Sequence, residues 1–404
     1  MSTLEQRQNV RTAQALALTL IPLVALGFAR FAYGSILPSM RADLGWTYRE
    51  AAIPAITNGL GYLIGAATAA RFVRRTGVAT AAVIALAATT VVTGATSVLG
   101  DLIWVSTLRG IAGATGGWAY VAGAIASAAL RDAGVKRAVV WYPAGTGVGI
   151  VVVAIIGLVI GDRIDLWREM WWLLGLLGVV ATLVVRRHTA RLSDIVPPDP
   201  STTSGGLTLV GWPIPVAYGL FGAGYIGVAT FGTSHLVDEG LTATTTQAFW
   251  LITGLTVALS ASAWAGPIER LPGGMPLAVP VAGCAVAAAL FLVSASTVAS
   301  IVSAAVFGSC VLTTMAGVTT IIRRRLDPAD WGRAFAAITA AFALGQVLGP
   351  MLALVVGEQS RVAYWLLAVS TGLLAAAAVV AGLGVRPPTR PSAPRGRVTI
   401  DGDR

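Results

Sequence analysis

The chain has 404 residues, of which 56% are hydrophobic and 11% are charged, and its mean hydropathy is +0.78. Soluble proteins carry about 25% charged residues, so this composition excludes an ordinary soluble domain and indicates an integral membrane protein. The formal net charge of +10 could suggest a nucleic-acid partner, but the placement of the basic residues along the chain explains it better.

Twelve apolar stretches follow one another along the chain. Each has about 18–25 residues, which is enough for a helix to cross a hydrocarbon core of about 30 Å. The first, from about Ala13 to Leu37, is too long for the core of a signal peptide, so we expect it to be retained. The stretches begin near residues 13, 53, 78, 102, 138, 167, 212, 245, 275, 298, 334 and 361.

The basic residues gather on one side of the predicted membrane. If the N-terminus is cytoplasmic, the tails and inner loops hold 21 of the 28 Lys and Arg residues. The outer loops hold Arg41, Arg49, Arg163, Arg168 and Arg361. The positive-inside rule therefore places both termini in the cytoplasm. Membrane topology explains the basic charge, so we expect no nucleic-acid partner.

A segment rich in Pro, Ser, Thr and Gly, 197–206, separates the sixth stretch from the seventh and predicts a flexible linker. The halves on either side repeat weakly, because the inner loops 70–77 and 266–273 both have eight residues and end in glycine. A matched pair of loops in a six-plus-six layout indicates duplicated bundles. We expect an N-terminal six-helix bundle over 1–190, a cytoplasmic linker over 191–210, a C-terminal six-helix bundle over 211–385 and a basic disordered tail over 386–404.

Glycines spaced four residues apart recur in the predicted spans and would let helix backbones approach closely. The pairs are Gly61/Gly65, Gly113/Gly117, Gly145/Gly149 and Gly345/Gly349.

Four segments carry a family resemblance: GFARFAYG with the later LP (27–38), NGLGYLIG (58–65), GAGYI (222–226) and LGQVLGP (344–350). They resemble the YbfB/YjiJ-type branch of the major facilitator superfamily, which consists largely of uncharacterised bacterial carriers. The resemblance covers essentially residues 10–385. It implies an all-α integral membrane fold of twelve transmembrane helices in two pseudo-symmetric six-helix bundles. It also implies a monomeric multi-pass carrier in the cytoplasmic (inner) membrane of a bacterium, working by alternating access.

The inner loop after the second span carries an altered form of a superfamily motif, Gly-x-x-x-Asp-Arg-x-Gly-Arg. Here Ala70 replaces the first glycine and Arg74 replaces the acid, which in the family helps to latch the outward-facing state. We hypothesise that Arg74 and Arg75 instead reach Asp327 or Asp330, just before the eleventh span. The candidate gating residues are Arg71, Arg74, Arg75, Gly77, Asp327 and Asp330.

Arg30 and Arg109 are the two cations predicted to lie within the membrane, and Arg109 begins the superfamily's Arg-x-x-x-Gly pattern on the fourth span. Each lies about seven residues, or about 10 Å, below the outer end of its span. In the family the first, fourth, seventh and tenth spans line the central cavity, so the resemblance places both arginines on its wall. Two guanidiniums without a nearby acid suit an anion such as a carboxylate or phosphonate. Two alternatives remain, since Arg30 could snorkel to the outer interface and Arg109 could bond backbone carbonyls.

Helical spacing selects companions for the two arginines. At 100° per residue Tyr120 falls near the face of Arg109, and Tyr33 is close to the face of Arg30. Aromatic stripes more often serve packing than ligand binding, whereas an amide in lipid needs a partner. The candidate substrate-binding residues are Arg30, Arg109, Tyr33, Asn58, Tyr62, Tyr120, Tyr225 and Gln346.

All 18 Asp and Glu residues fall in predicted loops, tails or helix ends, so the buried carboxylate that many proton-coupled carriers use is not expected. His235, at the outer end of the seventh span, is more typical of a surface histidine than of a proton relay. Cys284 and Cys310 lie in predicted spans and are expected to be buried thiols.

The leading hypothesis is a secondary active transporter, or facilitator, for a small organic anion such as a carboxylate. An efflux carrier for neutral or amphiphilic compounds is the main alternative. A membrane enzyme or non-transporting sensor is a further class, but the sequence offers no nucleophile–base or metal constellation and no long output domain. The sequence contains no Gly-rich phosphate-binding loop, so it does not indicate an ATP-driven pump. We expect no cofactor, no metal site and no partner other than the substrate and the lipid bilayer.

Overall fold

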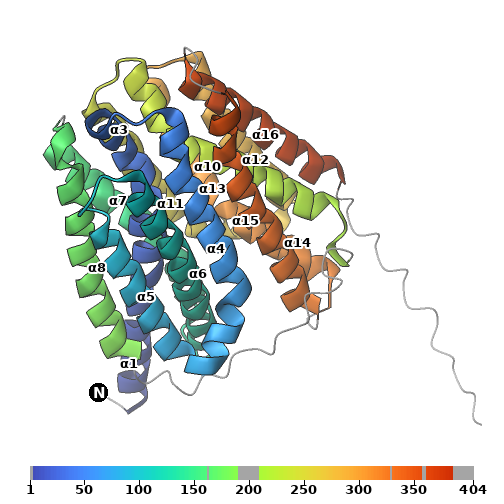
Figure 1. Cartoon of the computed structure of the whole chain (residues 1–404). Coiled ribbons are helices and arrows are strands. Elements are labelled where there is room, and N and C mark those ends of the chain that lie inside the picture. The colour runs from blue at the N-terminus through green and yellow to red at the C-terminus, as the bar shows by residue number, and fades with distance from the viewer. Residues whose placement is uncertain (1–2, 162, 190–208, 328–329, 357–360, 385–404) are drawn as a thin grey trace, which may run out of the picture.

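The computed structural model describes residues 3–161, 163–189, 209–327, 330–356 and 361–384 (Figure 1). Regular structure in these ranges is helical, and consecutive helices join into twelve long rods. The first rod combines α1 (Thr3–Leu18), α2 (Leu20–Pro22), the π-helix η1 (Leu23–Phe31) and α3 (Ala32–Leu44). The next rods are α4 (Tyr48–Thr76), α5 (Val78–Ala95), α6 (Leu102–Asp132), α7 (Ala138–Ile160) and α8 (Trp167–Thr189), with a 3-10 turn η2 (Ile164–Leu166) before α8. The remaining rods are α10 (Pro213–Asp238), α11 (Ala243–Arg270), α12 (Met275–Val293), α13 with α14 (Thr297–Val311 and Thr313–Arg325), α15 (Trp331–Val356) and α16 (Val362–Gly384).

Ten of these rods are long and apolar enough to cross a membrane by length and composition. The other two, α4 and α6, are longer than most but rich in glycine and polar residues along the contact between them. Apart from the first, every rod begins within five residues of its predicted start. The second starts early because Thr47 and Glu50 form a capping box that an apolar pattern does not detect.

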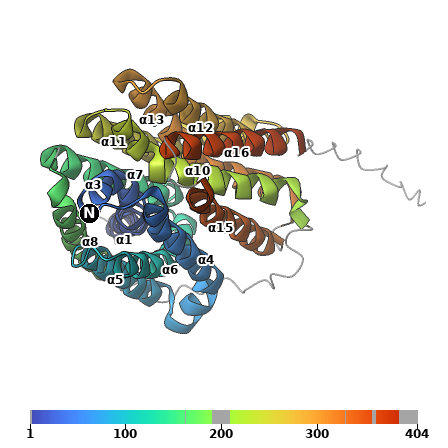
Figure 2. The ribbon, with the colours of Figure 1, turned by 45° about the horizontal axis from the view of Figure 1, so that its top comes forward.

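The rods of each half form a six-helix bundle, and each bundle supplies most of one buried apolar core (Figure 2). Large apolar side chains such as Val159, Val293 and Leu383 are exposed on the outside, as lipid contact requires. This is the predicted all-α fold with two bundles. The predicted linker, apart from its last two residues, and the predicted tail lie outside the described residues.

Glycine sets the distance between neighbouring rods. A Cβ atom added to Gly61 on α4 would lie 1.9 Å from the carbonyl oxygen of Gly110 on α6. One added to Gly113 would lie 2.1 Å from the carbonyl oxygen of Asn58. Gly145 approaches Thr19 as closely, in the first rod. The spaced glycines thus bring backbones together as predicted, so polar side chains can reach carbonyls of the next helix.

The first rod contains a nine-residue π-helix, Leu23–Phe31, which the sequence pattern did not predict. A π-helix bonds i to i+5, is wider than an α-helix and usually extends for one turn at a functional site. Neighbouring rods make room with glycine, because Cβ atoms on Gly116 and Gly149 would lie 3.3 and 2.5 Å from carbonyl oxygens of this segment. The rod also continues to Leu44 rather than Leu37, so Arg30 lies about 21 Å from its end, further than predicted.

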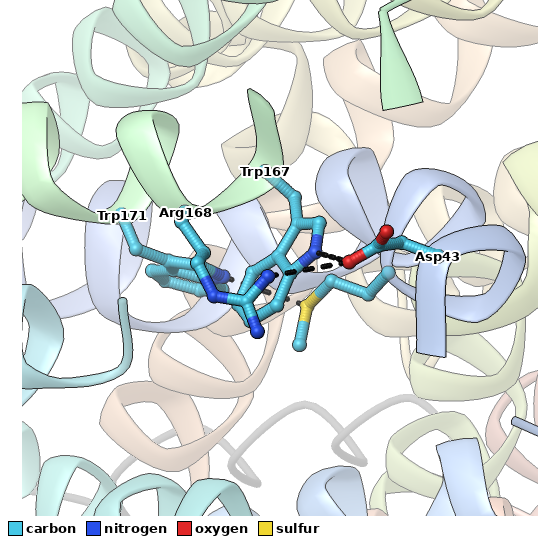
Figure 3. Close-up of polar contacts among 5 residues, drawn as sticks. Asp43, Trp167, Arg168 and Trp171 are labelled. Atoms are coloured by element: carbon cyan, nitrogen blue, oxygen red, sulfur yellow. Dashed lines mark hydrogen bonds and ion pairs between the residues drawn. The ribbon is translucent and has the colours of Figure 1, made fainter. Parts of the chain in front are cut away.

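The end of the first rod is fixed to α8 within the N-terminal bundle (Figure 3). The indole N–H of Trp167 donates to a carboxylate oxygen of Asp43 at 2.7 Å, and Arg168 reaches the same oxygen at 3.3 Å. One turn on, the indole N–H of Trp171 contacts the sulfur of Met40 at 3.5 Å. These contacts hold α3 and α8 together at one face of the molecule.

We call the face at which α4, α6, α8, α11, α14 and α16 end the terminal face, and the other the opposite face. At the opposite face the two bundles touch. The hydroxyl of Tyr48 donates to Asp238, the last residue of α10, and Arg41 lies 3.8 Å from the same carboxylate. Deeper in, the hydroxyl of Ser35 donates to the side-chain oxygen of Gln247 at 2.8 Å, and Thr233 donates to the carbonyl oxygen of Gly34 at 2.6 Å.

Towards the terminal face the bundles part. α4 and α15 touch at a point nearer to their ends at the opposite face, where a Cβ on Gly59 would lie 3.2 Å from the carbonyl oxygen of Gln346. Below that contact α4 diverges from α14 and α15 (Figure 1). The bundles are therefore in contact at the opposite face, whereas α4 diverges from α14 and α15 at the terminal face (Figure 1).

The glycine contact predicts a matched pair of stability effects. Gly61→Ala should lower the stability of the folded protein by about 1–3 kcal/mol, because its methyl group cannot fit against α6 without a backbone shift. Gly372→Ala is the control, since a Cβ there meets nothing within 4 Å. Thermal unfolding of the detergent-solubilised variants measures both, and equal midpoints would show that this contact does not limit stability.

Candidate functional site

Two small cavities between the bundles meet at Arg30. The larger, of about 60 Å³, lies on the terminal side of Arg30, and the smaller, of about 10 Å³, lies on its opposite side. The larger is lined by Leu26, Arg30, Phe31, Tyr62, Tyr120, Tyr218, Phe221, Tyr225, Val311, Leu312, Thr314, Met315, Phe342 and Gln346. The smaller is lined by Arg30, Phe31, Tyr33, Gly34, Ala55, Asn58, Arg109, Ile226, Ala229 and Thr230.

Arg30 presents a buried, uncompensated charge to these cavities. Its guanidinium lies 5.0 Å from the ring centre of Tyr62, and its Nε has no hydrogen-bond partner in the described structure. The ion pairs among the described residues do not include it. Because Arg30 is 8% exposed and lines the space between the bundles, it does not snorkel along the lipid-facing surface.

Arg109 donates hydrogen bonds to the backbone of the first rod. Its guanidinium donates to the carbonyl oxygen of Ala29 and, at 3.4 Å, to that of Arg30. The rings of Tyr33 and Trp171 lie 5.0 and 5.5 Å from it. Arg109 therefore stabilises the π-helical segment that carries Arg30, which is the alternative that the sequence left open.

α10 and α15 supply an aromatic wall to the larger cavity. Tyr218, Phe221 and Tyr225 follow one face of α10, and Phe342 of α15 stacks on all three with ring centres 4.7–5.8 Å away and planes 9–21° apart. The amide nitrogen of Gln346 donates to the hydroxyl of Tyr225 at 2.6 Å, while its side-chain oxygen is buried without a partner in the described structure.

The N-terminal bundle supplies the facing wall. Tyr62 of α4 and Tyr120 of α6 line the larger cavity, and the backbone oxygen of Tyr120 accepts a hydrogen bond from the Tyr142 hydroxyl at 2.7 Å. In the smaller cavity, the Asn58 amide donates to the backbone oxygen of Arg109 at 2.9 Å. There the Tyr33 hydroxyl donates to the carbonyl oxygen of Ala51 at 2.7 Å.

All eight predicted substrate-binding residues thus line one or both cavities. Sequence reasoning missed Phe342, Thr314 and Met315 as lining residues. Phe342 lies one helical turn before Gln346, and that spacing could have indicated it. Tyr218 and Phe221 share a helical stripe with Tyr225, a pattern that packing alone also produces.

The candidate gating residues lie apart in this conformation. Arg71, Arg74 and Arg75 are exposed near the end of α4, which Gly77 terminates with a φ of 82°. Asp330 pairs with Arg333, and the ion pairs of the described ranges include none between the loop and Asp327 or Asp330. The hypothesised latch concerns the outward-facing state and stays a prediction.

His235 is not the surface histidine that the sequence suggested. It is 3% exposed, and its Nε2 lies 3.3 Å from the carbonyl oxygen of Phe291 on α12. The ring of Tyr364 on α16 also lies beside it, 6.2 Å away. α12 and α16 cover this end of α10, a tertiary contact that local charge patterning does not show. Cys284 and Cys310 are buried free thiols, as predicted.

A family model described as "Uncharacterised MFS-type transporter YbfB" matches residues 22–382. The chain belongs to this family. It is therefore a major facilitator superfamily transporter, a multi-pass membrane protein and not an enzyme, as the sequence resemblance implied. The comparison with curated proteins gave no match.

Solved structures show the same fold at low sequence identity. A D-xylose–proton symporter aligns with a TM-score of 0.70 and 15% identity, covering 92% of this chain and 97% of its own. The nucleoside transporter NupG aligns with a TM-score of 0.69 and 14% identity, covering 93% and 98%. A bacterial homologue of the human drug peptide transporters PepT1 and PepT2 gives 0.69 and 12%, covering 92% and 96%. These similarities show the fold. They do not identify the substrate, which has to be inferred from the residues of the candidate site.

The two arginines should respond oppositely to removal of their charge. Arg109→Gln should destabilise the ligand-free protein by about 1–3 kcal/mol, because the carbonyls it serves are buried. Arg30→Gln should leave stability unchanged or raise it, since it removes a charge without a counter-ion. Thermal unfolding without added ligand tests the contrast, and an equal loss in both variants would mean that Arg30 is structural as well.

Proposed function

We propose that this transporter moves a small organic anion, such as a carboxylate, across the cytoplasmic membrane of a bacterium. The observation that carries the proposal is Arg30, a buried guanidinium on the wall between the bundles with no carboxylate beside it among the described residues. A charge within a membrane-spanning helix costs about 2.5–3.5 kcal/mol on insertion scales, and an anionic ligand would offset that cost.

The hydrogen-bond donors around Arg30 suit an anion. The guanidinium can hold a carboxylate with two parallel N–H bonds. The hydroxyl of Tyr225 accepts from Gln346, so its own hydrogen is left to donate to a ligand. Arg109 acts indirectly in this proposal, by holding the helical segment from which Arg30 projects.

The way in which the bundles meet supports alternating access. The positive-inside rule favours a cytoplasmic terminal face, which makes this conformation inward-facing. Opening to the outside then requires Asp238 to leave Tyr48 and Arg41, while the terminal ends of α4 and α15 approach. In that state Arg74 and Arg75 would come nearest to Asp327 and Asp330. A single chain supplies both walls of the cavity, so we expect a functional monomer.

The alternative is efflux of neutral or amphiphilic compounds, and the aromatic wall of the larger cavity favours it. It differs from anion transport in one respect that can be measured. A neutral ligand gains nothing from the charge of Arg30.

Substitution of Arg30 tests the anion proposal. Carboxylates or phosphonates that raise the unfolding temperature of the wild-type protein should lose this effect in Arg30→Gln. In Arg30→Lys, affinity should fall about tenfold or more, because the charge remains without the bidentate fork. Arg187→Lys, at the exposed end of α8, is the matched control. Stabilisation by anions that persists in both Arg30 variants would exclude this assignment.

The contacts of Asp238 predict a shift in the conformational equilibrium. Asp238→Asn removes the ion pair with Arg41, and we expect the outward-open population to rise about two- to fivefold. A cysteine at Ala55, which lines the smaller cavity, reports opening through its labelling by an impermeant maleimide in intact cells. The background carries Cys284→Ala and Cys310→Ala.

Glu239→Gln is the control for this experiment, because Glu239 pairs with Arg361 of the same bundle at 3.3 Å. Its labelling rate should equal that of the parent. If Asp238→Asn and Glu239→Gln label alike, the Asp238 contacts do not hold the opposite face closed.

A further inference from the structure

We infer that the anion is a planar aromatic monocarboxylate, with its carboxylate on Arg30 and its ring against Phe221, Tyr225 and Phe342. This inference rests on the proposed function and specifies the substrate class of the same site.

The charge of the larger cavity matches a single negative charge. Among its described lining residues Arg30 is the only charged side chain. Arg109 does not line it; the two terminal nitrogens of its guanidinium donate to the carbonyls of Ala29 and Arg30, and its Nε has no partner in the described structure. A monoanion would neutralise the cavity, whereas a dianion would leave an uncompensated charge among apolar side chains.

The walls of the cavity favour a flat ring. Seven of its fourteen lining residues are aromatic, and Phe342 lies within 9–21° of parallel with each of the three rings on α10. A planar ligand can extend such a set by offset stacking, but a puckered saturated ring of similar size cannot approach as closely. Aromatic walls also suit organic cations, and the charge of Arg30 excludes those.

The remaining surface of the cavity suits a small ligand with one polar end. Leu26, Val311, Leu312 and Met315 line it with apolar groups. At about 60 Å³ it has room for a few water molecules, which favours a single ring over a ligand with several rings.

Five probes separate the features of this ligand when they are titrated calorimetrically into the purified full-length protein at neutral pH. Benzoate should bind about 2- to 10-fold more tightly than cyclohexanecarboxylate, its saturated counterpart. It should bind at least about tenfold more tightly than benzamide, its neutral isostere, and than acetate, which lacks the ring. Phthalate, with two carboxylates, should bind more weakly than benzoate.

Two variants assign these preferences to residues. Phe342→Leu should lower the ratio of benzoate to cyclohexanecarboxylate affinity towards one. Phe72→Leu should not change that ratio, because Phe72 stacks on Trp118 at 4.6 Å, outside both cavities. Arg30→Gln should abolish the preference for benzoate over benzamide.

The wild-type titrations decide the matter even if Phe342→Leu does not fold. Equal affinities for benzoate and cyclohexanecarboxylate, both dependent on Arg30, would overturn the aromatic assignment and leave anion transport standing. Tighter binding of phthalate than of benzoate would overturn the inference that the ligand carries a single negative charge. If benzamide binds as well as benzoate, or no carboxylate binds at all, both the inference and the proposed function are wrong.

Discussion

The site depends on the contact between the guanidinium of Arg109 and the carbonyls of Ala29 and Arg30. These carbonyls belong to a π-helical segment, whose wide turn is held between glycines of α6 and α7. An unsupported π-helix of this length would revert to α-helical bonding, because its geometry is the less favourable one. Reversion would change the direction in which Arg30 projects from the rod. One buried cation thus fixes the position of another, and the two arginines have different tasks although the sequence presents them as a pair.

Glycines also allow the close contacts between the two bundles. At the opposite face, the hydroxyl of Thr233 reaches the backbone of Gly34 because glycine lets α3 approach α10. Gly157 likewise leaves room for the side chain of Gln247, which bonds Ser35 across the interface. In this protein the close packing of helices at glycine therefore makes the polar bonds between them possible. In lipid, burial of apolar surface does not drive helices together, so close packing and polar bonds supply much of the specificity of helix pairing.

The fold and eight of the residues that line the cavities could be predicted from the sequence, but the different contacts of Arg30 and Arg109 could not. Hydropathy located the helices because length and apolarity are what a bilayer demands of each span. Polar residues such as Asn58, Gln346 and Arg30 marked the cavities because lipid does not tolerate them elsewhere. The π-helix left no trace, since a change from i+4 to i+5 bonding does not alter the apolar pattern. The bond from Tyr48 to Asp238 joins residues 190 positions apart, which local spacing cannot reveal.

The contact between Gly59 of α4 and Gln346 of α15 lies off-centre along both helices. From Gly59, α4 extends about 26 Å towards the terminal face but about 17 Å towards the opposite face. If the bundles rock about this contact as a fulcrum, the longer arms make the terminal aperture the wider of the two for the same rotation. Gln346 also bonds Tyr225 at the cavity wall. The ligand would then be held where displacement is smallest, and its binding groups would keep their arrangement while access changes sides.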